Sequence, residues 1–385
     1  MCDTHSPILF VAQDGFDLPT ARIRCYGFAR HLTRRGFSTT TLSYRDDLHA
    51  SRQGVQLCLM GRWEQIILNL RAIPRLIKSP AKTIFYVQKV NYHCLAPKLV
   101  AKLRRFPLVV DFDDLEYQLH RPGCWQNRLV RHILRSAHAC VTGSHYLLGW
   151  LDQFNPNVHL VYTGVDTDFF APPPDETQRA SELKTPTLVW SGGVFDETTL
   201  DAARGVLDFF GELNRINPET RLLLLAYGNR LSQLAGMIRE HGAKGCIELI
   251  ENVNPRDIPR WLRRAHFGIF YFPTITPWVK AKSPTKLFEY MACGVVPVCG
   301  RGTEADHVVT DGWNGILFDR VQDGADRIAK LLESSENWMA MSGRARQAVI
   351  SKYALSEQVG HLSRLFQELT RQSAMGGPRR VSRRS

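Results

Sequence analysis

Residues 283–298 read SPTKLFEYMACGVVPV, and this stretch decides the fold of the second half of the chain. Pro284 suits the first turn of a helix, Gly294 suits its end, and the apolar run that follows is typical of a buried strand. Helices of parallel βα units begin at the carboxyl ends of the strands, which is the edge where such sheets bind ligands. The start of this helix is therefore expected to face a binding cleft.

The first turn of the predicted helix carries groups that suit a diphosphate. Backbone N–H groups and the positive end of the helix dipole attract phosphate oxygens there. Ser283 and Thr285 belong to that turn, and Lys286 would add a point charge to the same phosphates. Glu289 follows one turn later, and its carboxylate would accept both hydroxyls of a ribose. The alternative is that Lys286 and Glu289 form an ordinary pair on a helix surface.

Short apolar runs alternate with longer amphipathic stretches along the rest of the chain. This alternation is typical of parallel βα units and predicts an α/β protein with two doubly wound sheets. In the first half, strands are predicted over 7–12, 38–43, 65–70, 83–87, 108–112, 139–142 and 158–162, and helices over 20–35, 94–105, 125–137 and 145–153. In the second half, strands are predicted over 187–191, 222–226, 247–250, 268–272, 295–299 and 315–318, and helices over 323–333, 336–352 and 356–372.

The pattern predicts two domains with a binding cleft between them. The first domain covers residues 1–165, and a linker over 166–186 contains three successive prolines, which cannot lie inside a helix or a central strand. The second domain covers residues 187–355. Residues 356–372 are predicted to form a helix that returns to the first domain, and residues 373–385 a basic, disordered tail.

Five elements in order resemble the donor-binding signature of retaining GT-B glycosyltransferases of family 4. They are the acidic helix, the Cys293-Gly294-Val295-Val296-Pro297-Val298 strand, and then a Gly302, Glu304 and Asp311-Gly312-Trp313-Asn314-Gly315 series. The resemblance covers roughly residues 7–370 and implies two Rossmann-like domains. It implies transfer of a sugar from a nucleoside diphosphate sugar to an acceptor hydroxyl with retention, in glycan, polysaccharide or glycolipid synthesis. It also implies that Lys286 and Glu289 are catalytic, that Glu304 contacts the donor, and that no cofactor or metal is needed.

Two departures from the family pattern concern the donor. The family has two glutamates eight positions apart; Glu289 matches the second, but the first falls on Ala281. Family members also carry an arginine and a lysine after the first strand of the second domain. Here that region reads Trp190-Ser191-Gly192-Gly193, with no basic residue until Arg204. Backbone amides of Gly192 and Gly193 are expected to replace part of that diphosphate contact.

The first domain is expected to hold the acceptor, which would be a sugar, a lipid-linked molecule or another small molecule. Gly15 follows the first strand, and Arg22 and Arg24 are expected to face the cleft and bind an anionic acceptor or the leaving phosphate. The alternative for these arginines is an ordinary helix surface. Asp113 and Asp114, which follow a strand within Asp111-Phe112-Asp113-Asp114, are interpreted as acceptor-side residues, although an Asp-x-Asp pair also occurs at metal sites. His93 and His120 lie in this region, and neither has a distinctive sequence setting.

Composition and charge limit the remaining possibilities. The net charge of +12 includes a tail with Arg379, Arg380, Arg383 and Arg384, so contact with an anionic membrane surface is a further expectation. No apolar run is long enough to cross a membrane, and the start of the chain lacks the profile of a signal peptide. We therefore expect a cytoplasmic protein, with peripheral contact at the inner face of the membrane as a further expectation. No nucleic-acid-binding motif is present, and nucleic acid is not an expected partner. A GT-B epimerase or phosphorylase, or a catalytically weak sugar-nucleotide binder, remains an alternative function.

Overall fold

The computed structural model describes residues 5–50, 61–113, 115 and 125–374. The chain divides into two compact units, each of which is described here by itself. Unit 1 contains residues 1–163, 281–283 and 355–385, and unit 2 contains residues 164–280 and 284–354. Both units hold a parallel six-stranded sheet with helices, and this confirms the predicted α/β class with two doubly wound sheets.

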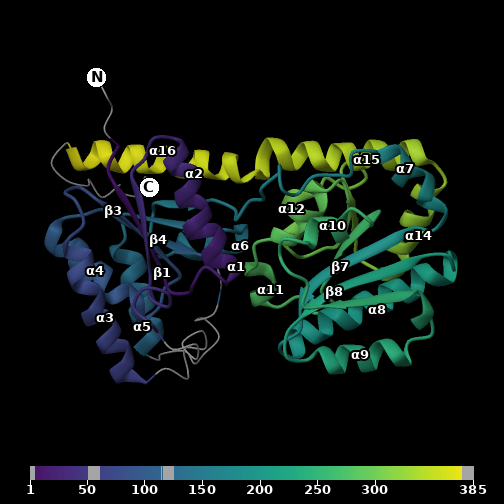
Figure 1. Ribbon diagram of the computed structural model, residues 1–385, viewed down its shortest axis with the longest axis horizontal. Coiled ribbons are helices and arrows are strands. Elements are labelled where there is room, and N and C mark those ends of the chain that lie inside the picture. Colours follow the sequence, from purple (N-terminus) through teal and green to yellow (C-terminus); the bar gives the residue numbers. More distant parts are fainter. Residues whose placement is uncertain (1–4, 51–60, 114, 116–124, 375–385) are drawn as a thin grey trace. The chain divides into compact units, whose positions relative to one another are not determined.

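Unit 1 is built on a sheet with the strand order β2-β1-β3-β4-β5-β6 (Figure 1). Every pairing in the sheet is parallel. The alternate side chains of the buried strands enter two different cores, because both faces of the sheet are covered. The strands are β1 (Ile8–Ala12), β2 (Thr39–Ser43), β3 (Ile84–Gln88), β4 (Leu108–Phe112), β5 (Ala139–Thr142) and β6 (Val158–Leu160).

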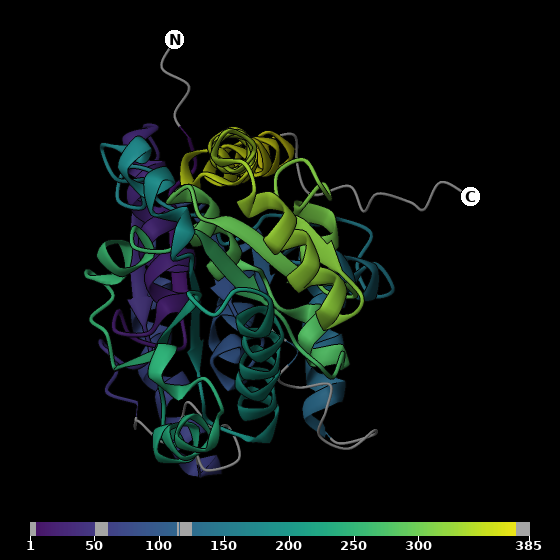
Figure 2. The same ribbon diagram turned by 90° about the vertical axis from the view of Figure 1, so that its right-hand side faces the viewer.

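The two faces of this sheet carry different sets of helices. One core joins the strands to α3 (Arg62–Ile77), α4 (Leu95–Arg104), α5 (Trp125–Ser136) and α6 (His145–Leu151). The other joins them to α2 (Phe28–Arg34) and to the C-terminal helix α16 (Leu355–Ala374). In Figure 2, α16 is the yellow coil seen nearly end-on, and it packs against α2.

Two helical segments of unit 1 differ from the prediction. The expected strand over 65–70 is wrong: these residues lie inside α3, where Ile66, Ile67 and Leu70 recur with the spacing of a helix surface. The helix expected over 20–35 is divided into α1 (Pro19–Ala21), a π-helical segment over Arg22–Gly27 and α2. π-Helical turns within α-helices are frequent at functional sites, and this one contains Arg24.

Unit 2 contains a sheet with the strand order β12-β11-β10-β7-β8-β9. Its strands are β7 (Thr187–Gly193), β8 (Arg221–Tyr227), β9 (Ile247–Glu251), β10 (Phe267–Phe270), β11 (Val296–Gly300) and β12 (Ile316–Phe318). Its helices are α7 (Glu176–Ser181), α8 (Glu197–Ile216), α9 (Leu231–Glu240), α10 (Ile258–Leu262), α11 (Pro277–Ala281), α12 (Thr285–Ala292), α13 (Ala305–Val308), α14 (Val321–Leu332) and α15 (Ser335–Ala348).

Residues 166–186, which the prolines predicted to be a linker, contain helix α7 and belong to unit 2. Arg179 of α7 is 4% exposed, and its guanidinium donates to the backbone oxygens of Cys293 and Gly294 at 3.1 and 2.8 Å. This segment therefore packs into unit 2 against the C-terminal end of helix α12. Within the described residues, no helix has both the length and the apolar composition that crossing a membrane requires.

Candidate functional site

The strand order of each unit marks where a ligand is expected. In doubly wound sheets, ligands bind outside the carboxyl ends of the strands at the point where the strand order reverses. In unit 2 this point lies between β7 and β10, and in unit 1 between β1 and β3. A ligand is therefore expected at the loops that follow these four strands.

Helix α12 presents the predicted donor residues on one side in unit 2. The helix begins at Thr285 with Pro284 as its N-cap residue, so Pro284 lies one position earlier than predicted. Thr285, Lys286 and Glu289 are half-exposed, whereas the intervening Leu287 and Phe288 are fully buried. Glu289 lies four residues after Thr285 and three after Lys286, and side chains at these separations are neighbours on a helix surface.

A buried tyrosine holds α12 against the end of β7. The hydroxyl of Tyr290 accepts a hydrogen bond of 2.8 Å from the backbone N–H of Ser191. Burial raises the pKa of Tyr290 above its ordinary value, so the phenol remains protonated. The Tyr290 ring also packs directly on Gly268 of β10, where an added Cβ would lie 2.4 Å from the ring. Helix α12 is thereby fixed at the reversal point of the sheet.

Three residues of unit 2 come together at the carboxyl end of β7. The indole ring of Trp190 covers Gly192, where an added Cβ would lie 2.0 Å from the ring. The Nζ atom of Lys286 lies 5.5 Å from the centre of the same ring, which is a cation–π distance. The structure therefore brings Lys286 of α12 next to the Gly192–Gly193 strand end. Sequence reasoning did not assign a role to Trp190, although it lies two residues before the glycine pair.

Glu304 connects to α12 indirectly. Its side chain is 3% exposed and lies at the start of α13. Burial, and then the charge of Glu304, raise the pKa of Tyr353, whose ring stacks on Phe288 of α12 at 4.7 Å. Glu304 thus lies near Tyr353, which in turn contacts Phe288 of α12.

Ser283 differs from the other predicted donor residues because it belongs to unit 1. Its hydroxyl accepts a hydrogen bond of 3.3 Å from Thr163.

Asp311 of the Asp-Gly-Trp-Asn-Gly series has a structural role in unit 2. Its carboxylate accepts hydrogen bonds from Arg327 at 2.6 Å and from the backbone N–H of Leu317 at 2.9 Å. Partial burial acts against ionisation, but these hydrogen bonds and the positive charges lower the pKa of Asp311 overall. The motif residue therefore fixes the turn that leads into β12.

Arg24 does not face a cleft, which corrects the prediction made for it. The side chain is 0% exposed, and the guanidinium donates to both carboxylate oxygens of Asp111, at 2.6 and 2.7 Å. It also donates to the backbone oxygen of Val161 at 2.9 Å, and Asp113 lies 3.8 Å away. Burial alone would lower the pKa of Arg24, but the charge of Asp111 raises it above its ordinary value. The π-helical turn therefore directs Arg24 inward to join the ends of β4 and β6.

The other predicted acceptor residues are affected by this network. Asp113 is 8% exposed beside Arg24, so it does not present an open carboxylate to a ligand. Both oxygens of Asp111 are engaged by Arg24, which weighs against the alternative of a metal site at this motif. Arg22 is half-exposed and donates to the backbone oxygen of Asp17 at 3.2 Å. Asp114 and His120 lie outside the described residues.

Buried polar residues that the prediction missed span the reversal point of unit 1. Lys89, which follows β3, places its Nζ atom 3.4 Å from the carboxylate of Asp14, which follows β1. The Asn91 side chain donates to that of Gln13 at 2.8 Å. Lys89 has a φ of 62°, a conformation that is uncommon for residues other than glycine and that clusters at functional sites. The sequence signal that could have identified these residues is the presence of charged and amide side chains directly after two apolar strands.

His93 is also buried in this region. Its Nε2 atom lies 2.8 Å from the backbone oxygen of Gln88. Burial lowers the pKa of His93 to about 4, so the ring is neutral at physiological pH.

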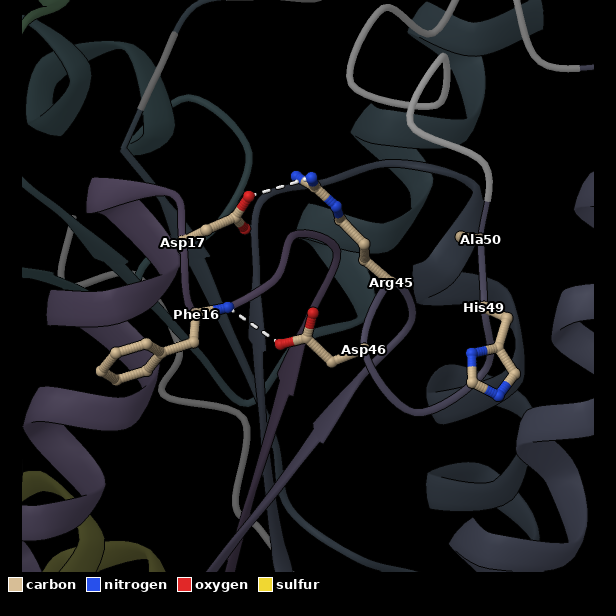
Figure 3. A pocket seen from close by; sticks show the side chains of 6 residues that line it. All are labelled: Phe16, Asp17, Arg45, Asp46, His49 and Ala50. Carbon is tan, nitrogen blue, oxygen red and sulfur yellow. Dashed lines mark hydrogen bonds and ion pairs between the residues drawn. The ribbon is translucent and has the colours of Figure 1, made fainter. Parts of the chain in front are cut away.

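A cavity of about 600 Å³ opens beside Gly15, at the carboxyl ends of β1 and β2 (Figure 3). Its lining residues are Phe16, Asp17, Arg45, Asp46, His49 and Ala50. The Asp46 carboxylate accepts a hydrogen bond of 2.9 Å from the backbone N–H of Phe16, and Arg45 pairs with Asp17 at 2.9 Å. An added Cβ on Gly15 would lie 2.2 Å from Asp46, so a larger residue at this position would displace the Asp46 carboxylate. Gly15 thus shapes the wall of a cavity in unit 1.

Comparisons with known proteins agree with these features. Residues 21–169 match the family described as glycosyltransferase family 4, and residues 185–348 match the family described as glycosyl transferases group 1. A GDP-mannose-dependent alpha-(1-6)-phosphatidylinositol monomannoside mannosyltransferase of Mycolicibacterium smegmatis is 28% identical over 175 residues. That match covers 43% of this chain and 44% of the relative, so it spans less than half of the length of either.

Solved structures show the same fold at low sequence identity. An Anabaena protein in complex with UDP-glucose is 14% identical with a TM-score of 0.71, covering 94% of this chain and 100% of that one. A glycosyltransferase of Rickettsia africae is also 14% identical with a TM-score of 0.71, covering 95% of this chain and 98% of that one. Two doubly wound units, two family matches in chain order and these structural neighbours lead to one conclusion. The chain belongs to the group 1 glycosyltransferases and has the GT-B fold.

Proposed function

We propose that the chain transfers a hexosyl or related glycosyl group from a nucleoside diphosphate sugar to an acceptor hydroxyl, with retention at the anomeric carbon. The observation that carries the proposal is the half-exposed face of α12, with Thr285, Lys286 and Glu289, next to the Trp190–Gly192 strand end. The mannosyltransferase relative is named for a GDP-mannose donor, and the Anabaena neighbour holds UDP-glucose. Both are consistent with a nucleotide sugar as the donor.

The proposed role of α12 follows from the charge that develops in the reaction. As the bond between the anomeric carbon and the diphosphate breaks, negative charge grows on the diphosphate. The first-turn N–H groups of α12 and the Lys286 ammonium would stabilise that charge in place, without reorganisation. The cation–π contact with Trp190 keeps Lys286 at the strand end where the diphosphate is proposed to lie. Glu289, on the same helix face, would accept the ribose hydroxyls.

The position of the family's first glutamate limits how the donor sugar is held. Ala281 occupies this position; it is fully buried, and its backbone oxygen accepts a hydrogen bond of 2.9 Å from Ser144. No carboxylate is therefore available at this position to contact the sugar. We propose that retention arises from attack on the same face as the departing diphosphate, because the family resemblance implies this course. The buried Ala281 is also the observation that favours the second candidate, a catalytically weak sugar-nucleotide binder.

The acceptor is proposed to bind unit 1, where the cavity beside Gly15 and the Lys89–Asp14 pair lie at the carboxyl ends of strands. The relative's name includes phosphatidylinositol, so a lipid-linked acceptor in glycolipid synthesis is the form of the proposal that it supports. A lipid-linked acceptor would require contact with a membrane, and we propose a cytoplasmic protein at its inner face. Arg24 contributes nothing to that contact because it is buried.

Nucleotide-sugar turnover tests the proposal. Purified chain should release nucleoside diphosphate from at least one nucleotide sugar when an acceptor is supplied. Lys286→Ala and Glu289→Ala should lower that rate by about tenfold to a hundredfold, the effect of losing a charge-assisted hydrogen bond. Arg204→Ala is the matched control, because Arg204 pairs with Asp201 on the surface of α8. Donor binding without turnover would favour the weak binder, and an epimerised donor sugar would favour an epimerase.

A further inference from the structure

Two neighbouring helices of unit 1 expose an unusual number of large apolar side chains. More than half of the exposed large hydrophobic residues in the described parts of the chain lie on α3 and α4. Trp63 is 77% exposed, Leu103 is 71% exposed and Leu70 is 60% exposed. The full set, which we call the apolar face, is Trp63, Ile66, Ile67, Leu70 and Ile77 on α3, and Leu95, Leu99 and Leu103 on α4.

These residues are arranged as a stripe on each helix. On α3, Ile66, Ile67 and Leu70 lie three, four and seven residues after Trp63, and on α4 the positions are separated by four residues throughout. Such spacing places side chains on one side of a helix. The opposite sides are already used, because Leu68, Ala72 and Leu76 of α3 and Val100 of α4 fill the core of unit 1. The side chains of the apolar face therefore do not contribute to the core of unit 1.

The two helices are fixed to each other. They pack together along the same face of the sheet of unit 1, where Figure 1 labels both helices. Asn69 of α3 accepts a hydrogen bond of 2.9 Å from the backbone N–H of Ala96 at the start of α4. At the other end, Arg104 of α4 donates to the backbone oxygen of Ile77 at 2.7 Å. The two stripes thus belong to one rigid surface.

The charge around the apolar face is mainly positive, although Glu64 lies on α3 and Asp47 lies 4.0 Å from Arg75. The sequence from residue 62 to residue 105 contains a single acidic residue, Glu64. The basic residues on and next to the two helices include Arg62, Arg71, Arg75, Lys78, Lys98, Lys102, Arg104 and Arg105, and all except the half-exposed Lys98 are exposed. Their long apolar stems allow the charged ends to reach outward beside the aliphatic residues. A partner of this surface must therefore be both apolar and negatively charged.

We infer that the apolar face docks on a lipid bilayer that carries anionic phospholipid. Helices that bind in the plane of a membrane combine Trp, Ile and Leu on one side with Lys and Arg at its edges, as α3 and α4 do. The apolar side chains enter the boundary between headgroups and acyl chains, and the cations bind the phosphates. An apolar patch of this extent on a folded chain marks an interaction surface.

The location of the surface suits a lipid-linked acceptor. Helices α3 and α4 begin after β2 and β3, so Trp63 and Leu95 lie at the same edge of the sheet as the cavity beside Gly15. Docking of the apolar face would bring the bilayer close to that edge, where both stripes begin. This last step rests on the proposed transfer to a lipid-linked acceptor, whereas docking itself does not.

Vesicle flotation with the full chain tests the inference without any catalysis. At low salt, the chain should float with vesicles of phosphatidylcholine and phosphatidylglycerol, and much less with phosphatidylcholine alone. The triple variant Trp63→Ser, Leu70→Ser and Leu103→Ser should bind the anionic vesicles at least about tenfold more weakly. Arg71→Gln and Lys102→Gln should each weaken binding by about fivefold. Ile216→Ser, at an exposed apolar residue of α8 in unit 2, is the matched control and should float as the wild type does.

The opposite results are equally distinct. A chain that ends at residue 374, and so lacks the basic tail, should still float; loss of flotation in this chain but not in the triple variant would overturn the inference. Absence of flotation at low salt would also overturn it. So would a dimer, seen by sedimentation velocity and removed by the triple variant, in a chain that does not float. Because flotation needs no turnover, these failures would leave the proposed sugar transfer untouched.

Discussion

Replacing Arg24 tests whether this buried arginine supports the fold or binds a ligand. Arg24→Met removes the cation that donates to both oxygens of Asp111 at 2.6 and 2.7 Å, with both side chains 0% exposed. It leaves the carboxylate of Asp111 buried without its partner, and Asp113 loses the cation 3.8 Å away. Breaking a buried pair by removing one partner costs about 3–5 kcal/mol of folding stability.

Urea unfolding followed by far-UV circular dichroism measures this loss. Arg22→Met is the control, because the half-exposed Arg22 donates only to the backbone oxygen of Asp17 at 3.2 Å. It should change the free energy of unfolding by less than about 0.5 kcal/mol. The double variant Arg24→Met and Asp111→Leu should recover part of the loss, since it removes both charges together. If Arg24→Met proved as stable as the wild type but no longer transferred sugar, Arg24 would be a ligand-binding residue. The claim that Arg24 supports the fold would then be wrong.

Three further predictions address other parts of the structure. Gly192→Ala should destabilise unit 2 by about 1–3 kcal/mol, measured by thermal unfolding, because the new Cβ would lie 2.0 Å from the Trp190 ring; an unchanged melting temperature would contradict the tight packing. Lys89→Met should lower the stability of unit 1, because Asp14, which is 2% exposed, loses a cation 3.4 Å away. It should leave nucleoside diphosphate binding by unit 2 intact. An equal loss of stability and of nucleotide binding would contradict the separate roles of the two units. Burial lowers the pKa of His266 to about 4, whereas the unfolded value is near 6.5. The contribution of neutral His266 to stability should therefore be complete above about pH 6.5 and fall by up to about 1.4 kcal/mol per pH unit between pH 6.5 and pH 4. The urea midpoints of the wild type and of His266→Gln should converge as the pH falls through this range. Midpoints that stay a constant distance apart would contradict this prediction.

The alternating pattern predicted most of the fold because both faces of each parallel sheet are covered. Strands with two buried faces appear as short, continuous apolar runs, and β4 has the predicted bounds, Leu108–Phe112. The pattern failed over 65–70, where Leu68 of α3 is buried but Ile66, Ile67 and Leu70 are exposed. An amphipathic helix whose apolar stripe serves another purpose than the core cannot be distinguished from a strand over so few residues.

The site was predicted only in part. Thr285, Lys286 and Glu289 could be placed on one helix face because the helix period alone determines their spacing. The positions of Arg24 and Lys89 depend on a π-helical turn and on a positive φ angle, and neither has a signal in a single sequence. Trp190 was missed because its contact with Lys286 joins residues far apart in the chain.

Calorimetric titration of nucleoside diphosphates tests the central claim about α12 most directly. The wild type should bind at least one of UDP, GDP and ADP. Lys286→Ala should weaken that binding by about tenfold to a hundredfold, because a charge-assisted contact with the diphosphate is lost. Arg204→Ala, on the surface of α8, should bind as the wild type does. A chain that binds none of these nucleotides, or a Lys286→Ala variant that binds them unchanged, would contradict the account.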